Sequence, residues 1–198
     1  MLAQLAPVLA RFGVDTTDVL AEDRRLVRRD VRTGLAFLLL KPDDVPTYVE
    51  YGAADVGVVG RDVLLEREYD LYEPLDLGIG RCRMVVAGFR DRALPRDRPV
   101  RVATKFPGIA RRHFGRAGIA VEVIFVQGSV EIAPLVGLAD VIVDLVESGE
   151  TLRQNGLAEL ETIVDVSSVV VVNRLSFKLH ERRVRELVRA LSALVPGA

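Results

Sequence analysis

The stretch GLADVIVDLVESGETL, residues 137–152, decides the fold that we expect for this chain. Its middle, VIVDLV at residues 141–146, is rich in Val and Ile and has the length of one buried strand. The turn that follows contains Ser148, Gly149 and Thr151, which suit the start of a helix. A strand that enters a helix through such a turn presents unpaired N–H groups and the positive end of the helix dipole. The stretch therefore predicts an anion site.

A carboxylate beside this turn favours a sugar phosphate as the ligand. Asp144 comes late in the predicted strand, so it would lie next to the turn. A carboxylate does not hold a phosphate, but it accepts hydrogen bonds from ribose hydroxyls or binds Mg²⁺. The alternative is a plain surface turn between a strand and a helix, because short Ser/Gly/Thr turns are common.

Composition narrows the class of protein. The chain has 198 residues, 49% of them hydrophobic and 28% charged, which is enough for a core in one large or two small domains. A net charge of −1 gives no general attraction to nucleic acid or anionic membranes. The single cysteine, Cys82, excludes an internal disulfide, and His113 and His180 are too far apart to favour a histidine metal site. Without an apolar span or a leader pattern, we expect a soluble cytoplasmic protein.

Strand-like and helix-like segments alternate along the chain. This order predicts an α/β protein with mainly parallel sheets. The expected strands are residues 35–40, 55–59, 83–87, 100–103, 121–126, 141–146 and 168–172. The main expected helices are residues 1–13, 45–51, 63–68, 107–117 and 130–136, with a last helix that Ser176 caps.

A short internal sequence repeat predicts two lobes. GAADVGVV at residues 52–59 resembles GLADVIVD at residues 137–144, and each follows a short predicted helix. Since ligands bind at the carboxyl ends of such strands, two lobes of this kind predict a ligand cleft between them. We expect residues 1–88 with 174–198 to form lobe I, and residues 89–173 to form lobe II.

Further segments carry a resemblance to a known family. They are DVPTYVE (44–50), ADVGVVGRD (54–62), LDLGIGRCR (75–83), RVATKFP (101–107) and GSVEIAP (128–134). With these segments the chain resembles the catalytic subunit of ATP phosphoribosyltransferase in its short form, the first enzyme of histidine biosynthesis. The segments are distributed over most of the length of the chain in the family's order, so the resemblance is specific.

The resemblance implies a fold, a reaction and a partner. The fold is that of type II periplasmic binding proteins. In the Mg²⁺-dependent reaction, N1 of the adenine of ATP attacks the anomeric carbon of 5-phosphoribosyl 1-pyrophosphate (PRPP), and pyrophosphate leaves. The substrate carries the Mg²⁺, so we expect no metal ligands in the chain. Short forms work with an inactive paralogue of histidyl-tRNA synthetase, which implies a hetero-octamer, a homodimer for the chain alone, and inhibition by histidine.

The resemblance also assigns residues to the site. The family's phosphate turn, which would hold the 5′-phosphate of PRPP, falls on Glu147, Ser148, Gly149, Glu150, Thr151 and Leu152. Asp140 and Asp144 match acidic positions near the ribose, and Arg24 matches a basic position, so that Arg24 and Asp144 are the expected catalytic residues. Candidates for contacts with ATP are Asp55, Arg81, Arg83, Lys105 and Ser129. A surface role is the alternative for the two arginines, and holding a backbone turn is the alternative for Asp55. Capping of the following helix is the alternative for Lys105 and Ser129.

The start of the chain departs from the family pattern. The family begins with a strand and a Pro-Lys-Gly-Arg turn, whereas this chain begins at the helix that follows them. Without that strand, we expect this chain to turn over substrate more slowly than a chain extended upstream. Equal rates for the two chains would refute this expectation. The alternative function is a non-catalytic small-molecule-binding or sensor protein of the same two-lobed fold, which only turnover distinguishes from an enzyme.

Overall fold

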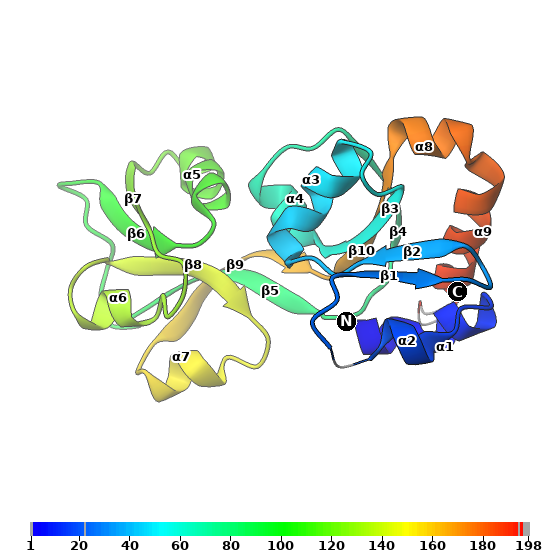
Figure 1. Ribbon diagram of the computed structural model, residues 1–198. Coiled ribbons are helices and arrows are strands. Elements are labelled where there is room, and N and C mark those ends of the chain that lie inside the picture. The colour runs from blue at the N-terminus through cyan, green and yellow to red at the C-terminus, as the bar shows by residue number, and fades with distance from the viewer. Residues whose placement is uncertain (1, 22, 194, 196–198) are drawn as a thin grey trace. The chain divides into compact units, whose positions relative to one another are not determined.

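The computed structural model describes residues 2–21, 23–193 and 195, and it divides the chain into two compact units (Figure 1). The first unit comprises Met1–Leu64, Glu68–Gly80 and Ser167–Ala198, and the second comprises Leu65–Arg67 and Arg81–Val166. The two-lobed α/β class expected from the sequence is therefore confirmed. None of the helices in the described part of the chain is both long enough and apolar enough to cross a membrane.

The first unit surrounds a three-stranded antiparallel sheet in the order β3-β10-β4. Its elements are α1 (Leu2–Arg11), α2 (Thr16–Val19), β1 (Val27–Asp30), β2 (Leu35–Leu38), the 3-10 helix η1 (Pro42–Asp44), α3 (Val45–Glu50), β3 (Val56–Gly60), most of α4 (Arg61–Glu66), β4 (Leu71–Asp76), β10 (Ser168–Asn173), α8 (Arg174–Leu179) and α9 (Glu181–Ser192). The central strand β10, SVVVVN, is buried along its whole length, as a continuous apolar run predicts. Gly57 lets α3 pack closely on β3, because a Cβ there would lie 2.7 Å from Val45.

Two details of the first unit differ from expectation. The hairpin of β1 and β2 forms a separate two-stranded sheet, so β2 is only half-buried although its sequence reads as a buried strand. Asn173 caps α8 by accepting from the backbone N–H groups of Leu175 and Ser176, so Ser176 lies inside that helix and is not its cap. Asparagine and serine are both common N-cap residues, so the sequence alone does not show whether the helix begins after Asn173 or after Ser176.

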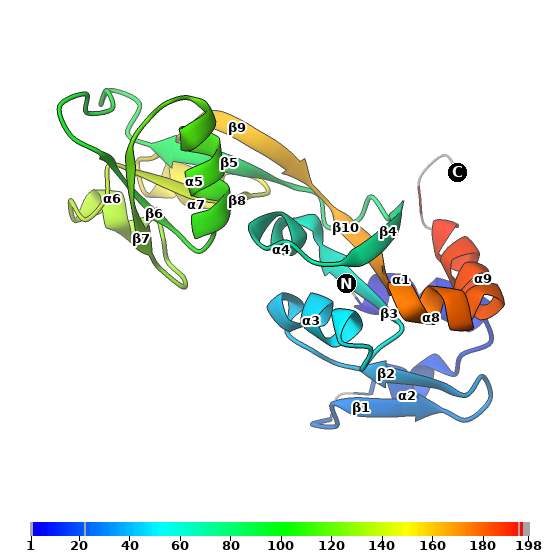
Figure 2. The ribbon, with the colours of Figure 1, turned by 90° about the horizontal axis from the view of Figure 1, so that it is seen from above.

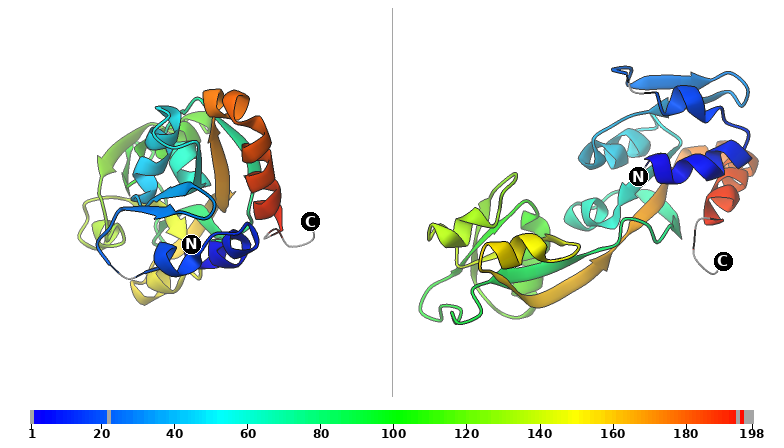
Figure 3. Two further views of the ribbon diagram at one scale, coloured as in Figure 1. Left: turned by 45° about the vertical axis from the view of Figure 1, so that its right-hand side comes forward. Right: turned by 90° about the horizontal axis from the view of Figure 1, so that it is seen from below.

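The second unit contains a five-stranded mixed sheet in the order β7-β6-β8-β5-β9. Its elements are β5 (Cys82–Gly88), β6 (Val100–Thr104), α5 (Pro107–Arg116), β7 (Val121–Phe125), α6 (Ile132–Leu135), β8 (Val141–Val146), α7 (Glu150–Gln154) and β9 (Ala158–Val166). Helix α5 covers one face of the sheet, and α6 and α7 cover the other (Figures 2 and 3). Successive side chains of β5 alternate between the two faces of the sheet. Met84 and Val86 pack with α5, whereas Val85 and Ala87 pack on the opposite face.

The sheets are not mainly parallel, contrary to expectation, because two are antiparallel and the five-stranded sheet is mixed. In the described chain, parallel pairing is limited to β6–β7 and β6–β8, and all other pairs are antiparallel. Apolar runs indicate strands but carry no information on their direction.

The boundaries between the units also differ from those expected. Strand β5 lies in the second unit because it pairs with β8 and β9, whereas residues 81–88 were expected in lobe I. Strand β10 lies in the first unit because it pairs with β3 and β4, whereas residues 167–173 were expected in lobe II. The Val-rich stretch 158–173 thus divides at Ser167 into strands of two different sheets.

Candidate functional site

The parallel strands β6, β7 and β8 end at the same edge of the second unit. Thr104, the last residue of β6, lies opposite both Phe125 of β7 and Val143 of β8. Lys105 therefore follows at the position next to Asp144. We call this region the carboxyl edge, defined as Lys105, Ser129, Glu131, Asp144 and the turn 147–151. The opposite end of these strands, where Arg98 and Asp140 lie, is the amino edge.

Buried Thr104 fixes the backbone at the carboxyl edge. Its hydroxyl donates to the carbonyl of Val143 at 2.6 Å and accepts from the backbone N–H of Phe106 at 2.8 Å. The exit of β6 is thereby tied both to β8 and to the start of α5. The side chain of Lys105, which follows Thr104, is half-exposed, and its Nζ lies 5.8 Å from the centre of the Phe106 ring.

Asp144 is half-buried at the carboxyl edge, and Oδ1 accepts from the backbone N–H of Leu145 at 2.8 Å. Burial raises the pKa of its carboxyl, and the negative charge of Glu131 acts in the same direction. The Leu145 hydrogen bond and the positive charge of Lys105 only partly oppose this rise in pKa. A carboxylate that is withdrawn from water beside another acid and a lysine is typical of a functional site.

The turn after β8 has the form that its sequence predicts. Gly149 adopts φ +74°, a left-handed conformation that favours glycine, and it precedes α7. The Ser148 hydroxyl accepts from the backbone N–H of Glu150 at 3.3 Å. Glu150 itself is exposed, and its carboxylate contacts Arg153 at 2.5 Å and Gln154 at 2.9 Å, which holds its pKa below the ordinary value. Glu147 and Thr151 are exposed at this turn.

Leu152, the last residue expected in the phosphate turn, has a buried side chain. Its side chain is 4% exposed and packs in the core with Ala133 and Ile142. In a helix that lies on a sheet, every third or fourth side chain points inward, and Leu152 occupies that position in α7. Its side chain therefore supports the turn from the core, and its backbone N–H lies in the first turn of α7.

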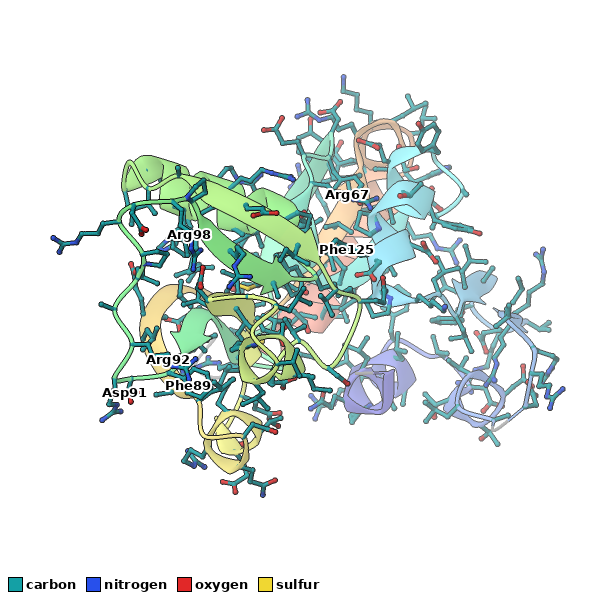
Figure 4. All side chains as sticks on the ribbon, turned by 90° about the vertical axis from the view of Figure 1, so that its left-hand side faces the viewer. Arg67, Phe89, Asp91, Arg92, Arg98 and Phe125 are labelled. Carbon is teal, nitrogen blue, oxygen red and sulfur yellow. The ribbon has the colours of Figure 1, made fainter. Side chains whose placement is uncertain are left out.

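The structure also corrects the expectation for Asp140, because it lies at the amino edge. Its carboxylate accepts from Arg98 at 2.7 and 2.8 Å and from the backbone N–H of Arg101 at 2.9 Å. These partners hold the pKa of Asp140 well below its usual range. About 13 Å of strand separates it from Asp144, at roughly 3.3 Å per residue. Figure 4 labels Arg98 of the amino edge and Phe125, which ends β7.

The other candidate residues fall in several places. Ser129 lies at the carboxyl edge with φ +49°, and it is the one non-glycine among the described residues with a positive φ. Arg83 lies opposite Val146, but its guanidinium pairs with Glu159 at 3.0 Å. Arg81 is exposed where the second unit resumes.

Asp55 lies just before β3, as Asp140 lies just before β8, in agreement with the internal sequence repeat. It is exposed in the first unit, and its carbonyl accepts from the backbone N–H of Asn173 at 3.0 Å. This bond involves the backbone of Asp55, so the role of its side chain stays a prediction.

The arginine-rich segment of the first unit separates into different roles. Arg25 binds the carboxylates of Asp18 and Asp23, and Arg28 is buried. Arg24 is exposed, and no hydrogen bond or ion pair joins its side chain to another described residue. Of these three arginines, Arg24 is the one whose guanidinium is available to an anion. The sequence does not show this distinction, because the partners of Arg25 and Arg28 lie up to ten residues away.

Comparison with protein families identifies the relatives of the chain. The model of the family described as HisG, ATP phosphoribosyltransferase, matches residues 41–193. ATP phosphoribosyltransferase of Sorangium cellulosum is 56% identical over 198 residues, which are 100% of this chain and 93% of the relative. ATP phosphoribosyltransferase 2 of Geobacter sulfurreducens is 44% identical over 195 residues, covering 96% and 92% of the two chains.

Solved structures agree with this family. A chain of the ATP phosphoribosyl transferase (HisG:HisZ) complex from Thermotoga maritima is 34% identical, with a TM-score of 0.85 over 97% of this chain and 92% of that one. The periplasmic aliphatic sulphonate binding protein SsuA from Escherichia coli is 13% identical, with a TM-score of 0.58 over 96% and 69%. The second likeness concerns the fold alone and confirms the type II periplasmic-binding-protein architecture.

Proposed function

The chain belongs to the ATP phosphoribosyltransferase family, and we propose that the carboxyl edge of its second unit binds the phosphoribosyl group of PRPP. The family's reaction condenses ATP with PRPP to N1-(5-phosphoribosyl)-ATP and pyrophosphate, the first step of histidine biosynthesis. One observation carries the placement: Lys105 follows the end of β6 next to Asp144 of β8, and β8 leads into the glycine turn that opens α7. Cation, carboxylate and backbone N–H groups thus converge at one edge of the sheet.

The parts of PRPP correspond to different groups at this edge. The N–H groups of the turn 148–151 suit the 5′-phosphate, because Gly149 places no side chain in its path. Asp144 suits the ribose hydroxyls, which donate to a carboxylate. Lys105 adds positive charge toward the phosphates. Ser129 is the further candidate here for a contact with ATP.

The reaction needs positioning and charge stabilisation more than proton transfer. Adenine N1 has a free lone pair, so the N1–C1 bond forms as the bond from C1 to the pyrophosphate oxygen breaks, and no base is required. Negative charge grows on the departing pyrophosphate, and cations placed there lower the barrier. We assign Arg24 to a phosphate or pyrophosphate contact, because its guanidinium is exposed and not committed to another described residue.

Mg²⁺ fits this edge as an ion carried by the substrate. Asp144 and Glu131 interact there, and among the described residues no group of three or more His, Cys, Asp or Glu side chains is arranged to hold a metal. Mg²⁺ bound to substrate phosphates needs only one or two protein carboxylates. When bound, it would neutralise charge on the pyrophosphate, and Asp144 with Glu131 or Glu147 would face it.

A regulatory partner is part of the proposal. The Thermotoga maritima relative is described as a HisG:HisZ complex. We infer that this chain also assembles with a subunit resembling histidyl-tRNA synthetase, in a hetero-octamer, and that histidine inhibits through that subunit. Light scattering of the chain with and without the partner tests the assembly.

Turnover tests the proposal. We expect absorbance to grow when ATP, PRPP and Mg²⁺ are mixed with the chain and its partner. Asp144→Ala and Thr151→Ala should each abolish most of this growth, whereas the control Gln154→Ala, exposed on the same helix, should not. PRPP binding without product would instead support the non-catalytic binding protein, and full activity of both variants would contradict the placement.

A further inference from the structure

Two charged side chains stand out in the described structure because they are buried. Arg28 is 4% exposed and Asp30 is 5% exposed, and no other described Asp, Glu, Lys or Arg is buried. Both lie on the inward face of β1, whose residues alternate between exposed and buried. An apolar residue would fill such a position without the cost of removing a charge from water. The pair therefore indicates a specific task.

Asp30 holds the start of α2 and the turn of the hairpin. Its carboxylate accepts from the backbone N–H of Asp15 at 3.0 Å, from that of Thr33 at 2.7 Å, and from the Thr33 hydroxyl. Asp15 is the N-cap of α2, so Asp30 acts on the amino end of that helix. None of these partners belongs to the loop of residues 23–25, which contains Arg24.

Arg28 holds the other end of α2 and, in addition, the loop that follows. Nη1 donates to the carbonyls of Val19 at 2.8 Å and of Asp18 at 3.0 Å. Nη2 donates to the carboxylate of Asp23 at 3.3 Å, and Nε donates to the carbonyl of Arg25 at 3.4 Å. These last two partners are the residues on either side of Arg24.

We propose that Arg28 is a positioning residue that fixes the loop presenting Arg24 to phosphate. The inference rests on the proposed role of Arg24. Arg25 strengthens the same loop, since it binds Asp23 and Asp18 at 2.7 Å each. With both neighbours held, the backbone of Arg24 is already ordered before the ligand arrives. Preordering of this kind lowers the entropy that is lost on binding and keeps the guanidinium in place during the reaction.

A double-mutant cycle with Arg24→Ala, Arg28→Met and the double variant tests this proposal. Met has a similar length and avoids an unpaired buried charge. We expect Arg28→Met to lower kcat by about tenfold or more, since small displacements of a catalytic group have effects of this size. In the Arg24→Ala background, the same substitution should have no further effect.

The buried neighbour supplies the control. Asp30→Asn should change activity by the same factor in both backgrounds, because its contacts do not reach the loop. If Arg28→Met also lowers kcat equally in both backgrounds, Arg28 is merely structural and the proposal is wrong. Should Arg28→Met not fold, Asp23→Asn enters the same cycle, because it weakens the carboxylate that Arg25 and Arg28 share.

A second readout separates failure of this inference from failure of the proposed function. Calorimetric titration with inorganic pyrophosphate does not depend on turnover. Equal weakening by Arg24→Ala, Arg28→Met and the double variant would support the positioning role even if the chain formed no product. Unchanged affinity and unchanged kcat in Arg24→Ala would remove the role of Arg24, and the role of Arg28 with it.

Discussion

Two aspartates along β8 are in opposite environments, one just before the strand and one in its carboxyl-terminal half. At the amino edge, Asp140 is paired with Arg98 and Arg101, which hold its pKa well below the usual range. At the carboxyl edge, Asp144 is half-buried and its pKa is raised. The charged form of Asp140 therefore stabilises the fold, whereas the charged form of Asp144 costs stability. Proteins accept such a cost where a group must meet a ligand.

The largest effect that we expect comes from Asp144→Asn. Loss of the charge should lower kcat/KM by about 10²–10³-fold, the range seen when a preorganised polar group is removed from an active site. The Asn oxygen still accepts from the Leu145 N–H, and the desolvation cost disappears, so the melting temperature should not fall. Steady-state kinetics and calorimetry on the same samples measure both quantities. A large loss of stability would place Asp144 with the structural residues.

Adjacent residues of α7 sharpen the comparison within the carboxyl edge. Leu152→Ala should lower the free energy of unfolding by about 2–4 kcal/mol, because it leaves a cavity under the turn. Thr151→Val, at an exposed position, should change stability by less than about 0.5 kcal/mol but weaken PRPP binding. Urea unfolding and PRPP titration of both variants provide the test, and a reversal of the two effects would refute it.

Asp140→Asn should act on stability and not on chemistry. It removes charge-assisted hydrogen bonds to Arg98 and Arg101, and we expect a loss of about 1–2 kcal/mol because Arg98 is partly solvated. At a temperature where the variant is fully folded, kcat should match that of the unaltered chain. A selective loss of kcat in a fully folded sample would return Asp140 to the ribose site.

The smallest effects concern pH. The stabilisation from Asp140 is complete above the ordinary aspartate pKa of about 3.9 and disappears as the pH falls through its lowered value. The cost from Asp144 is complete above its raised pKa and disappears as the pH falls toward the ordinary value. Urea unfolding at a series of acidic pH values should therefore show Asp140→Asn approaching the unaltered chain from below and Asp144→Asn from above. Parallel curves would contradict this assignment.

Local sequence chemistry was sufficient for much of the fold. The apolar run at residues 141–146 and the glycine turn predicted β8 and the start of α7, and both are confirmed. In these places, short-range signals and tertiary packing agree.

The remaining features depend on pairing between distant segments. Strand direction decides that Asp140 and Asp144 lie at opposite edges, although only four positions separate them in the sequence. Sheet partners decide that β5 and β10 belong to other units than expected. Contacts with Asp18 and Val19 decide which arginine is buried and which is exposed. None of these pairings leaves a local pattern.

One measurement tests the central claim most directly, namely that the carboxyl edge holds PRPP and the amino edge stabilises the sheet. It is the calorimetric affinity of PRPP with Mg²⁺ for the unaltered chain, Asp144→Asn and Asp140→Asn, each fully folded. We predict that Asp140→Asn binds as tightly as the unaltered chain, and that Asp144→Asn binds at least about tenfold more weakly, the loss of roughly one charge-assisted hydrogen bond. Weak binding by Asp140→Asn together with normal binding by Asp144→Asn would contradict the account.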